Sequence, residues 1–296
     1  MHKKLRTVLI VGLIATVIGV IIGFIGWYGN HQKLDNVNYN HGFKIVKYQK
    51  RSDYQINDFK KLNLQVQGAD VEIKRGNKFK LETKLPDQQK LTVDQNNDKM
   101  SIISSRFEFA GIGFNHENSY ITLTVPKDYP LSELKVMMSD GALTINHLKV
   151  DEKVQIQNEN AGIILNNVNF NQSTVTNSDG GIRLIDGEFN NIDLRNDEGA
   201  LRTVNTKFTG ENKIWVRDSS IVLSKLNDNL QTQLEVENGD LTIDYDNAIT
   251  QKEHHGDDVL EKSTIGNDEN NKLTVHNVYG SIRVAKDEVR EYSDNY

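Results

Sequence analysis

A repeat of about 20 residues runs through the second half of the chain and restricts the fold more than any other feature of the sequence. Each copy has a corner of small and polar residues followed by a short apolar stretch, as in NENAGIIL (158–165) and NSDGGIRL (177–184). The first apolar residue after the corner recurs at steps of 20, 19, 19, 20, 20 and 41 residues, and the last step is about two periods. This column contains Leu143, Ile163, Ile182, Leu201, Ile221, Leu241 and Ile282. Such regular spacing indicates stacked structural units.

Further apolar residues recur two positions after and seven positions before this column, which describes two period-2 strands joined at the corner. An earlier copy has Leu64, Ala69, Val71 and Ile73 in the same columns. A unit this short cannot bury its apolar face alone, so units must stack, with equivalent residues about 4.8 Å apart. We therefore predict an all-β protein, a β-solenoid with coils of about 20 residues; the usual crossover handedness would make it a right-handed parallel β-helix. The alternative is an antiparallel two-sheet sandwich with an accidental period.

The N-terminus carries an uncharged apolar stretch, VLIVGLIATVIGVIIGFIG (8–26), followed by Trp27 and Tyr28. At 1.5 Å per residue it matches the ~30 Å hydrocarbon core, and the two aromatic residues suit the membrane interface. Three basic residues precede the stretch and no acidic residue occurs before Asp35, so the positive-inside rule places the N-terminus in the cytoplasm. We predict one transmembrane helix at 8–28 in the cell membrane, with the remainder of the chain outside. The alternative is a cleaved signal peptide, whose apolar core would be shorter.

The part beyond this helix is acidic. Removing the first 30 residues removes three of the 35 basic residues and none of the 41 acidic ones, which leaves a formal charge of 32 − 41 = −9. This charge disfavours nucleic acid as a partner. The chain contains no cysteine, which excludes a disulfide framework and a cysteine-linked lipid anchor.

Composition divides the chain into segments of different character. Residues 1–7 are expected to be the cytoplasmic N-terminus, and the polar, weakly patterned residues 29–57 a juxtamembrane stalk. The β-repeat domain is expected at 58–285, with a polar flap at 247–271 that fills the step of double length. The charged residues 286–296 are expected to form a C-terminal tail.

The runs DFKKLNLQVQGADVEIKRG (58–76) and YITLTVPKDYPLSELKVMMSDGALTI (120–145), followed by the corner-and-strand units, resemble the bacterial "putative adhesin" β-strand-repeat family. That family is a domain of unknown function carried by membrane-anchored cell-envelope proteins. The resemblance covers about 58–285. It implies a β-repeat domain outside the membrane, in some cases linked to envelope stress, and it implies no catalytic residues.

One polar column could hold a cation. The residue before the small corner residue is acidic or an asparagine, and stacking would bring these side chains about 5 Å apart. Clustered carboxylates suit Ca²⁺, which would make the protein a calcium-stabilised structural solenoid. The simpler interpretation is that Asp and Asn bond to the backbone at turns, and we therefore assign no metal-binding residues. The column contains Asp140, Asn160, Asp179, Glu198, Asp218 and Asn238.

Two other groups of residues have potential chemistry. Arg183, Arg202 and Arg283 share a column and could contact an anionic polymer, although such rows more often pair with acidic neighbours. His254 and His255, beside two aspartates, offer metal ligands without a rigid spacing.

The sequence contains no motif typical of an enzyme: G-x-S-x-G, G-x-x-x-x-G-K and H-E-x-x-H do not occur. We therefore predict a non-enzymatic protein without a cofactor that mediates an interaction at the cell envelope. The alternative is a polysaccharide-acting enzyme, because some β-helices carry catalytic clusters on an outer face.

Two sets of residues are candidate contact sites. Phe107, Phe109 and Phe114 lie in FEFAGIGF (107–114), outside the repeat columns, and could dock a partner; alternatively, their rings cap the open end of the solenoid. Small residues on one face of the apolar helix could bring two helices together as a homodimer. These residues are Gly12, Ala15, Gly19, Gly23 and Gly26. The expected partners are membrane lipid through residues 8–28 and either another envelope protein or a wall polymer.

Overall fold

The computed structural model describes residues 3–29, 36–39, 42–107, 110–112, 118–228, 230–255 and 258–288. The chain divides into two compact units, one formed by Met1–Tyr48 and Glu108–Glu117, the other by Gln49–Phe107 and Asn118–Tyr296. The first unit contains the N-terminal helix and a small sheet, and the second contains the repeat.

The N-terminal unit begins with helix α1 (Lys3–Gly29). Its segment Arg6–Gly29 has a mean hydropathy of 3.0 in its most apolar stretch, none of which is buried. A helix that is apolar on every side suits lipid or a protein interior rather than water. The predicted apolar helix is therefore present. An antiparallel sheet of order β2–β1–β9 belongs to the same unit, with β1 (Asn36–Asn38), β2 (Lys44–Val46) and β9 (Gly111–Ile112).

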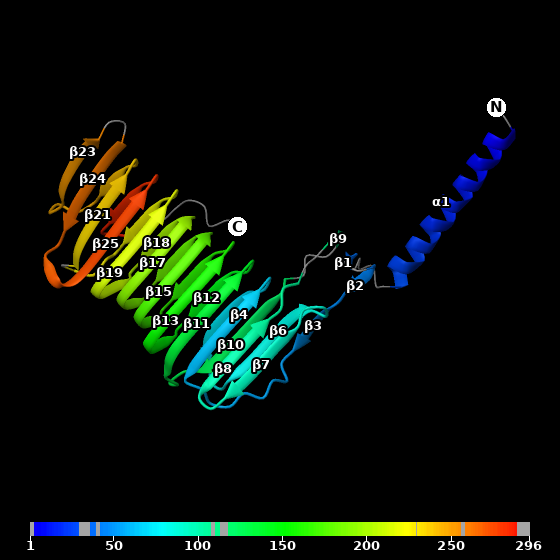
Figure 1. The fold of residues 1–296 in the computed structure, drawn as a ribbon, viewed down its shortest axis with the longest axis horizontal. Coiled ribbons are helices and arrows are strands. Elements are labelled where there is room, and N and C mark those ends of the chain that lie inside the picture. Colours follow the sequence, from blue (N-terminus) through cyan, green and yellow to red (C-terminus); the bar gives the residue numbers. More distant parts are fainter. Residues whose placement is uncertain are drawn as a thin grey trace. The chain divides into compact units, whose positions relative to one another are not determined.

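The second unit consists of two sheets around a shared apolar core (Figure 1). The short-strand sheet has eleven strands, in the spatial order β22 (Leu241–Ile243), β26 (Ile282–Ala285), β20 (Ile221–Ser224), β18 (Leu201–Val204), β16 (Ile182–Ile185), β14 (Ile163–Asn166), β12 (Leu143–Asn146), β5 (Asp70–Gly76), β10 (Tyr120–Pro126), β6 (Lys80–Pro86) and β3 (Tyr48–Arg51). The long-strand sheet has twelve, in the order β23 (Ile249–His255), β24 (Asp258–Ile265), β21 (Leu230–Glu237), β25 (Asp268–Val278), β19 (Lys207–Arg217), β17 (Glu188–Glu198), β15 (Asn169–Asp179), β13 (Lys149–Glu159), β11 (Leu131–Ser139), β4 (Lys61–Gln67), β8 (Lys99–Ser104) and β7 (Leu91–Asn96).

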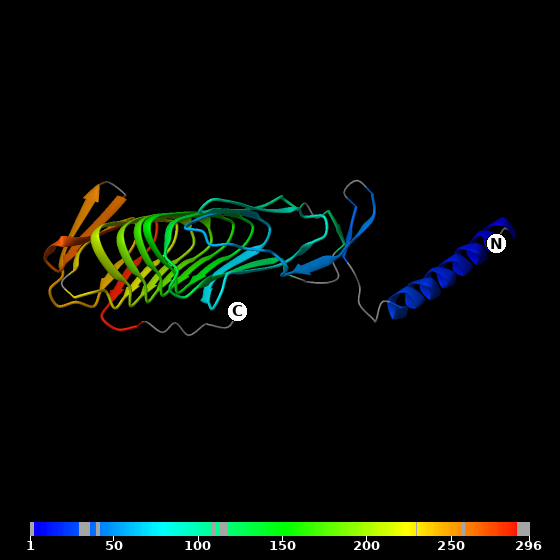
Figure 2. The same cartoon turned by 90° about the horizontal axis from the view of Figure 1, so that it is seen from below.

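Consecutive coils in the middle of the unit stack in parallel, with each residue on its equivalent (Figure 2). Ile163 pairs with Ile182, Ile182 with Leu201, and Leu201 with Ile221. All four side chains are fully buried, so the repeat column is a ladder inside the core. The earlier copy joins the same ladder, because Val71 pairs with Leu143. Parallel pairing excludes the antiparallel sandwich and confirms the predicted β-solenoid.

The corners between long and short strands bring backbones too close together for side chains. A Cβ added at Gly199 would lie 2.4 Å from the carbonyl carbon of Gly180 in the neighbouring coil, and one added at Gly239 would lie 1.6 Å from the carbonyl oxygen of Gly280. Gly180 and Gly199 also have φ angles of +118° and +112°, which favour glycine. The column of small residues therefore follows from close stacking as well as from turn conformation.

Buried asparagines complete these corners from the inside. Equivalent inward positions are occupied by Asn158, Asn177, Asn196 and Asn277, none more than 1% exposed. The Nδ2 atom of Asn158 donates to the carbonyl oxygen of Ala161 at 2.9 Å, and that of Asn177 donates to Gly180 at 2.7 Å. Asn177 also donates to Oδ1 of Asn196 at 3.1 Å. The side chains thus supply hydrogen bonds to corner carbonyls that turn toward the core.

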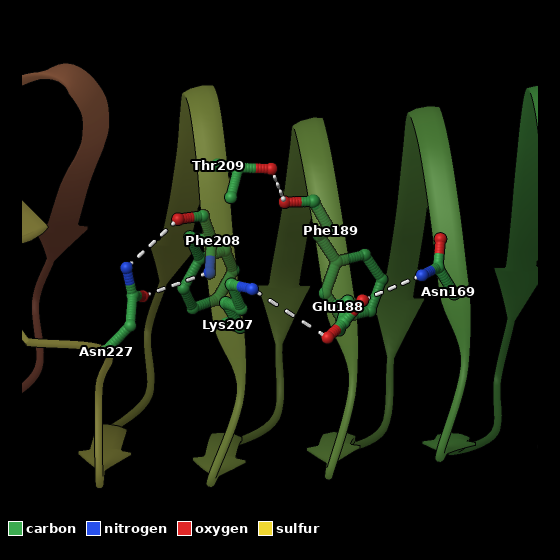
Figure 3. Close-up of polar contacts among 7 residues, drawn as sticks. All are labelled: Asn169, Glu188, Phe189, Lys207, Phe208, Thr209 and Asn227. Carbon is green, nitrogen blue, oxygen red and sulfur yellow. Dashed lines mark hydrogen bonds and ion pairs between the residues drawn. The ribbon is translucent and has the colours of Figure 1, made fainter.

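Aromatic rings stack at the start of the long strands. The ring centres of Phe170 and Phe189 lie 5.9 Å apart, and those of Phe189 and Phe208 lie 6.1 Å apart. At Phe208 the side chain of Asn227 forms the hydrogen bonds that a neighbouring strand would otherwise form (Figure 3). The N–H of Phe208 donates to Oδ1 of Asn227 at 3.1 Å, and Nδ2 of Asn227 donates to the Phe208 carbonyl at 3.3 Å. Strand β25 pairs with β19 only from Gly210 onward, so Asn227 supplies the partners that backbone groups need.

The spatial order of the coils departs from their order in the sequence at both ends of the stack. Strand β25 lies between β19 and β21, and β26 lies between β20 and β22. The last coil of the chain is therefore inserted into the stack, and Ile282 pairs with both Ile221 and Leu241. At the other end, β4 lies between β11 and β8, and β5 lies between β12 and β10.

The segments outside the regular coils also contain strands. The polar segment 247–271, predicted to be a flap, contains the antiparallel hairpin β23–β24 and the first residues of β25, and β24 pairs antiparallel with β21. The hairpin extends the long-strand sheet at its edge, and antiparallel strands of this kind can expose one polar face to water. The predicted stalk at 29–57 contains the strands β1, β2 and β3. The domain boundaries stay predictions.

Candidate binding surface

A row of outward side chains crosses the long-strand sheet, one residue from each of nine adjacent strands. Each residue of the row directly follows a buried apolar residue on its strand, so side-chain alternation turns the row away from the core. It consists, in spatial order, of Ile103, Gln65, Met137, Gln157, Thr176, Arg195, Trp215, His276 and Glu235. We refer to these nine residues as the cross-strand row. Because strands lie about 4.8 Å apart, the row offers one side chain per step along the stack.

The surface is hollowed around Trp215. A groove of about 670 Å³ runs across β15, β17, β19 and β25. Its lining includes Thr176, Asp193, Arg195, Lys213, Trp215 and His276. The half-buried indole of Trp215 forms an apolar wall among these polar groups. The groove therefore combines an aromatic surface with hydrogen-bond donors and acceptors.

Charges of both signs surround the indole. The guanidinium carbon of Arg217 lies 5.8 Å from the Trp215 ring centre, and its Nη2 atom lies 3.5 Å from Oδ1 of Asp197. Nε of Arg195 lies 3.6 Å from Oδ1 of Asp193. Ion pairs this exposed add little to stability. Their effect is to hold planar donors and acceptors beside an aromatic ring.

Two smaller hollows lie farther along the row, around Met137, with volumes of about 280 and 230 Å³. Met137 is 37% exposed and Ile103 is 40% exposed. The row thus offers apolar contacts at Ile103, Met137 and Trp215, with the polar Gln157 and Thr176 between Met137 and Trp215. Open hollows spaced along one line suit an extended ligand better than a small enclosed one.

The conformation of the turns explains why Asp and Asn recur in the polar column, at the position before the small corner residue. Four of its members have φ angles between +54° and +62°: Asp140, Asn160, Asp218 and Asn238. Asn and Asp adopt this conformation more readily than most residues. In the copies with Asp179 and Glu198, the following glycine has the positive φ instead. Nδ2 of Asn160 donates to Oδ1 of Asp140 at 2.9 Å, so this carboxylate has a partner within the column.

The column of Arg183, Arg202 and Arg283 is not continuous in the structure. Arg183 and Arg202 are register partners, but Val222 lies between Arg202 and Arg283. The three arginines therefore do not form a continuous ladder. The two histidines of the predicted flap, His254 and His255, belong to β23, where His254 is exposed and pairs with Val259.

The predicted contact residues can be placed only in part. Phe107 is half-buried, and Phe109 and Phe114 lie outside the described residues. On helix α1, an added Cβ would meet no atom within 4 Å at the glycines of the predicted contact face, Gly12, Gly19, Gly23 and Gly26. Ala15 lies on the same helix and is exposed. Docking through the phenylalanines and pairing of two helices stay predictions.

The repeat pattern does not reveal the cross-strand row, because its members share an outward position and not a residue type. One signal in the sequence points to it. Trp215 is one of two tryptophans in the chain, and it directly follows the inward Ile214, so strand alternation places it on the outside. Tryptophan at such a position is uncommon and is enriched in contact sites.

Two solved structures of bacterial proteins are similar to this chain at low sequence identity. No curated protein matches the sequence. A crystal structure from Clostridium sporogenes, described as a "putative cell adhesion protein", is similar at 10% identity with a TM-score of 0.35, over 81% of this chain and 99% of the other. A "putative adhesin" from Bacteroides fragilis is similar at 10% identity with a TM-score of 0.36, over 80% of this chain and 97% of the other. Likenesses this distant do not bear on function.

The family comparison is more specific. The model of the Toastrack DUF4097 family matches residues 59–285, which is the region of the two stacked sheets and more than half of the chain. This match agrees with the resemblance drawn from the corner-and-strand units. The chain belongs to the Toastrack DUF4097 family.

Proposed function

We propose that this chain is a non-enzymatic, membrane-anchored interaction protein at the exterior of the bacterial cell envelope, with an adhesin-like role. In this proposal helix α1 is the anchor, the β-solenoid is a rigid support, and the cross-strand row is the contact surface. The observation that carries the proposal is the groove at Trp215, where a half-buried indole lies among paired charges on an outward sheet face.

The partner that best fits this surface is a wall polysaccharide. A polysaccharide is an extended chain, and the row continues from strand to strand along the stack. Sugar rings have apolar faces and polar edges, which suit an indole flanked by Arg195, Asp193 and Thr176.

The proposal predicts that Trp215→Ala weakens binding of isolated cell-wall polysaccharide. Truncating a central aromatic contact costs about 2 kcal/mol, or roughly thirtyfold in Kd. Binding can be followed by indole fluorescence of the full-length protein in detergent, in a Trp27→Phe background where Trp215 is the remaining tryptophan. For Trp215→Ala itself, co-sedimentation with the polysaccharide replaces fluorescence.

Ile164→Ala is the matched control, because Ile164 is a large apolar residue exposed on the short-strand sheet. It should leave polysaccharide binding unchanged. Equal binding by Trp215→Ala and the unmodified protein would remove the groove from the contact surface. If the unmodified protein does not bind the polysaccharide but crosslinks to an envelope protein in a way that depends on Trp215, the partner is that protein and not a polysaccharide.

A further inference from the structure

We propose that Glu235, Glu237 and His276 form a binding site for a divalent transition-metal cation such as Zn²⁺, at the end of the cross-strand row. The three residues come from two adjacent parallel strands, β21 and β25. Glu235 and His276 are direct register partners, and Glu237 stands two positions further along β21, on the same outward face. The site does not depend on the proposed binding of a polysaccharide.

The three side chains already converge. One potential ligand atom from each, a carboxylate oxygen or an imidazole nitrogen, lies within 4.8 Å of the other two. The Nε2 atom of His276 lies 3.3 Å from Oε1 of Glu237. Ligands about 2.1 Å from a common metal ion are at most about 4.2 Å apart, so small side-chain rotations suffice to enclose a cation.

The state of the imidazole nitrogen is a separate observation that points to a ligand. The Nε2 atom of His276 is shielded from solvent and makes no hydrogen bond, although it lies close to Glu237. A buried polar atom without a hydrogen bond is costly, and such atoms often face a missing ion or water. When Nε2 is deprotonated, its lone pair faces the carboxylates, where a shared cation would lie.

The donor set selects the class of metal. One imidazole nitrogen and two carboxylates are ligands that Zn²⁺ accepts in a tetrahedral site with a water molecule in the fourth position. Ca²⁺ and Mg²⁺ prefer oxygen-only sites, so the histidine favours a transition metal. An aromatic residue flanks the site on one side and a basic residue flanks it on the other. Trp215 pairs with His276 from β19, and Lys262 pairs with Glu235 from β24.

Lys262 provides an independent electrostatic test. Directly opposed residues of an antiparallel pair share one face of the sheet, so the ammonium group lies on the same side as the carboxylate of Glu235. A positive charge beside the carboxylates, on the same face of the sheet, opposes binding of a cation. Removing it should strengthen metal binding, whereas removing any of the three ligands should weaken it.

The test uses the full-length protein in detergent, titrated with Zn²⁺ in equilibrium dialysis and with Co²⁺ in visible absorption. We expect one bound ion per chain and an absorption band of low-coordinate Co²⁺. His276→Gln, Glu235→Gln and Glu237→Gln should each weaken binding at least tenfold, and Lys262→Gln should tighten it. Saturating Zn²⁺ should raise the Tm of the unmodified protein and leave that of His276→Gln unchanged.

The control is His254→Gln, because His254 is an exposed histidine on β23 outside the site. It should bind as the unmodified protein does. If His276→Gln retains unmodified affinity while its melting curve shows a folded protein, the site is overturned. Binding of less than one ion per chain at micromolar Zn²⁺ would also overturn it, and would assign His276 and Glu237 to an ion pair alone.

Discussion

Replacing Ile182 by aspartate is expected to lower the free energy of unfolding by at least ~3 kcal/mol, a large part of the total of about 5–15 kcal/mol that holds a typical domain together. Ile182 is fully buried, and its register partners Ile163 and Leu201 are fully buried as well. A carboxylate at this position would have only aliphatic neighbours above and below it. The ladder gives it no donor and no access to water.

The measurement is a urea titration of the full-length protein in detergent, followed by circular dichroism. Arg183→Gln is the matched control, because Arg183 is the next residue on β16 and is exposed on the outer face. It should change the midpoint little. If Ile182→Asp and Arg183→Gln shift the midpoint equally, the assignment of inward and outward columns is incorrect.

Ending the chain after residue 267 is expected to dismantle a larger part of the structure than the 29 residues that it removes. Strands β25 and β26 would be lost, and each lies between two other coils rather than at the end of the stack. Strand β21 would lose its parallel partner, and β22 would lose its pairing with β26. The apolar side chains of β19 and β20 that face this coil would become exposed to water.

Limited proteolysis measures this effect. The truncated protein should be cleaved readily between 225 and 267, while the coils from β11 to β18 resist. A chain that ends after Glu288 keeps both inserted strands and should resist as the full-length protein does. A sequential stack would behave differently, since loss of the last coil would leave β21 packed on β19. Equal resistance of the two truncated chains would contradict the inserted order.

Much of the fold is predictable from the sequence because each coil repeats the same physical demands. Burial requires an apolar residue at every inward position, and close stacking requires a small one at each corner, as Ile182 and Gly199 show. These demands determine which residues share a column. They do not determine which coils are neighbours, since any coil with the right columns can stack on another. For this reason the pairing of Ile282 with both Ile221 and Leu241 is not visible in the repeat.

The roles of the buried asparagines and of the binding surface could not be predicted from the sequence, for two different reasons. Asn177 and Asn196 are polar residues in a column that elsewhere contains Val216, and their role depends on corner carbonyls that only the folded chain brings near. The cluster of Glu235 and His276 depends on the inserted coil, because the two residues are neighbours only after β25 enters beside β21. Glu235 and His276 are 41 residues apart in the sequence, and this separation alone does not predict that they are neighbours.

The central claim, that the β-solenoid lies outside the membrane on an uncleaved anchor, is tested most directly by cysteine labelling in cells. The natural chain has no cysteine, so Arg183→Cys provides a single thiol on the exposed outer face of β16, and His2→Cys provides one at the N-terminus. A membrane-impermeant maleimide applied to intact protoplasts should label the full-length protein at position 183 and label position 2 only after permeabilisation. Labelling at position 183 that requires permeabilisation, or a labelled protein that lacks its N-terminal helix, would contradict the account.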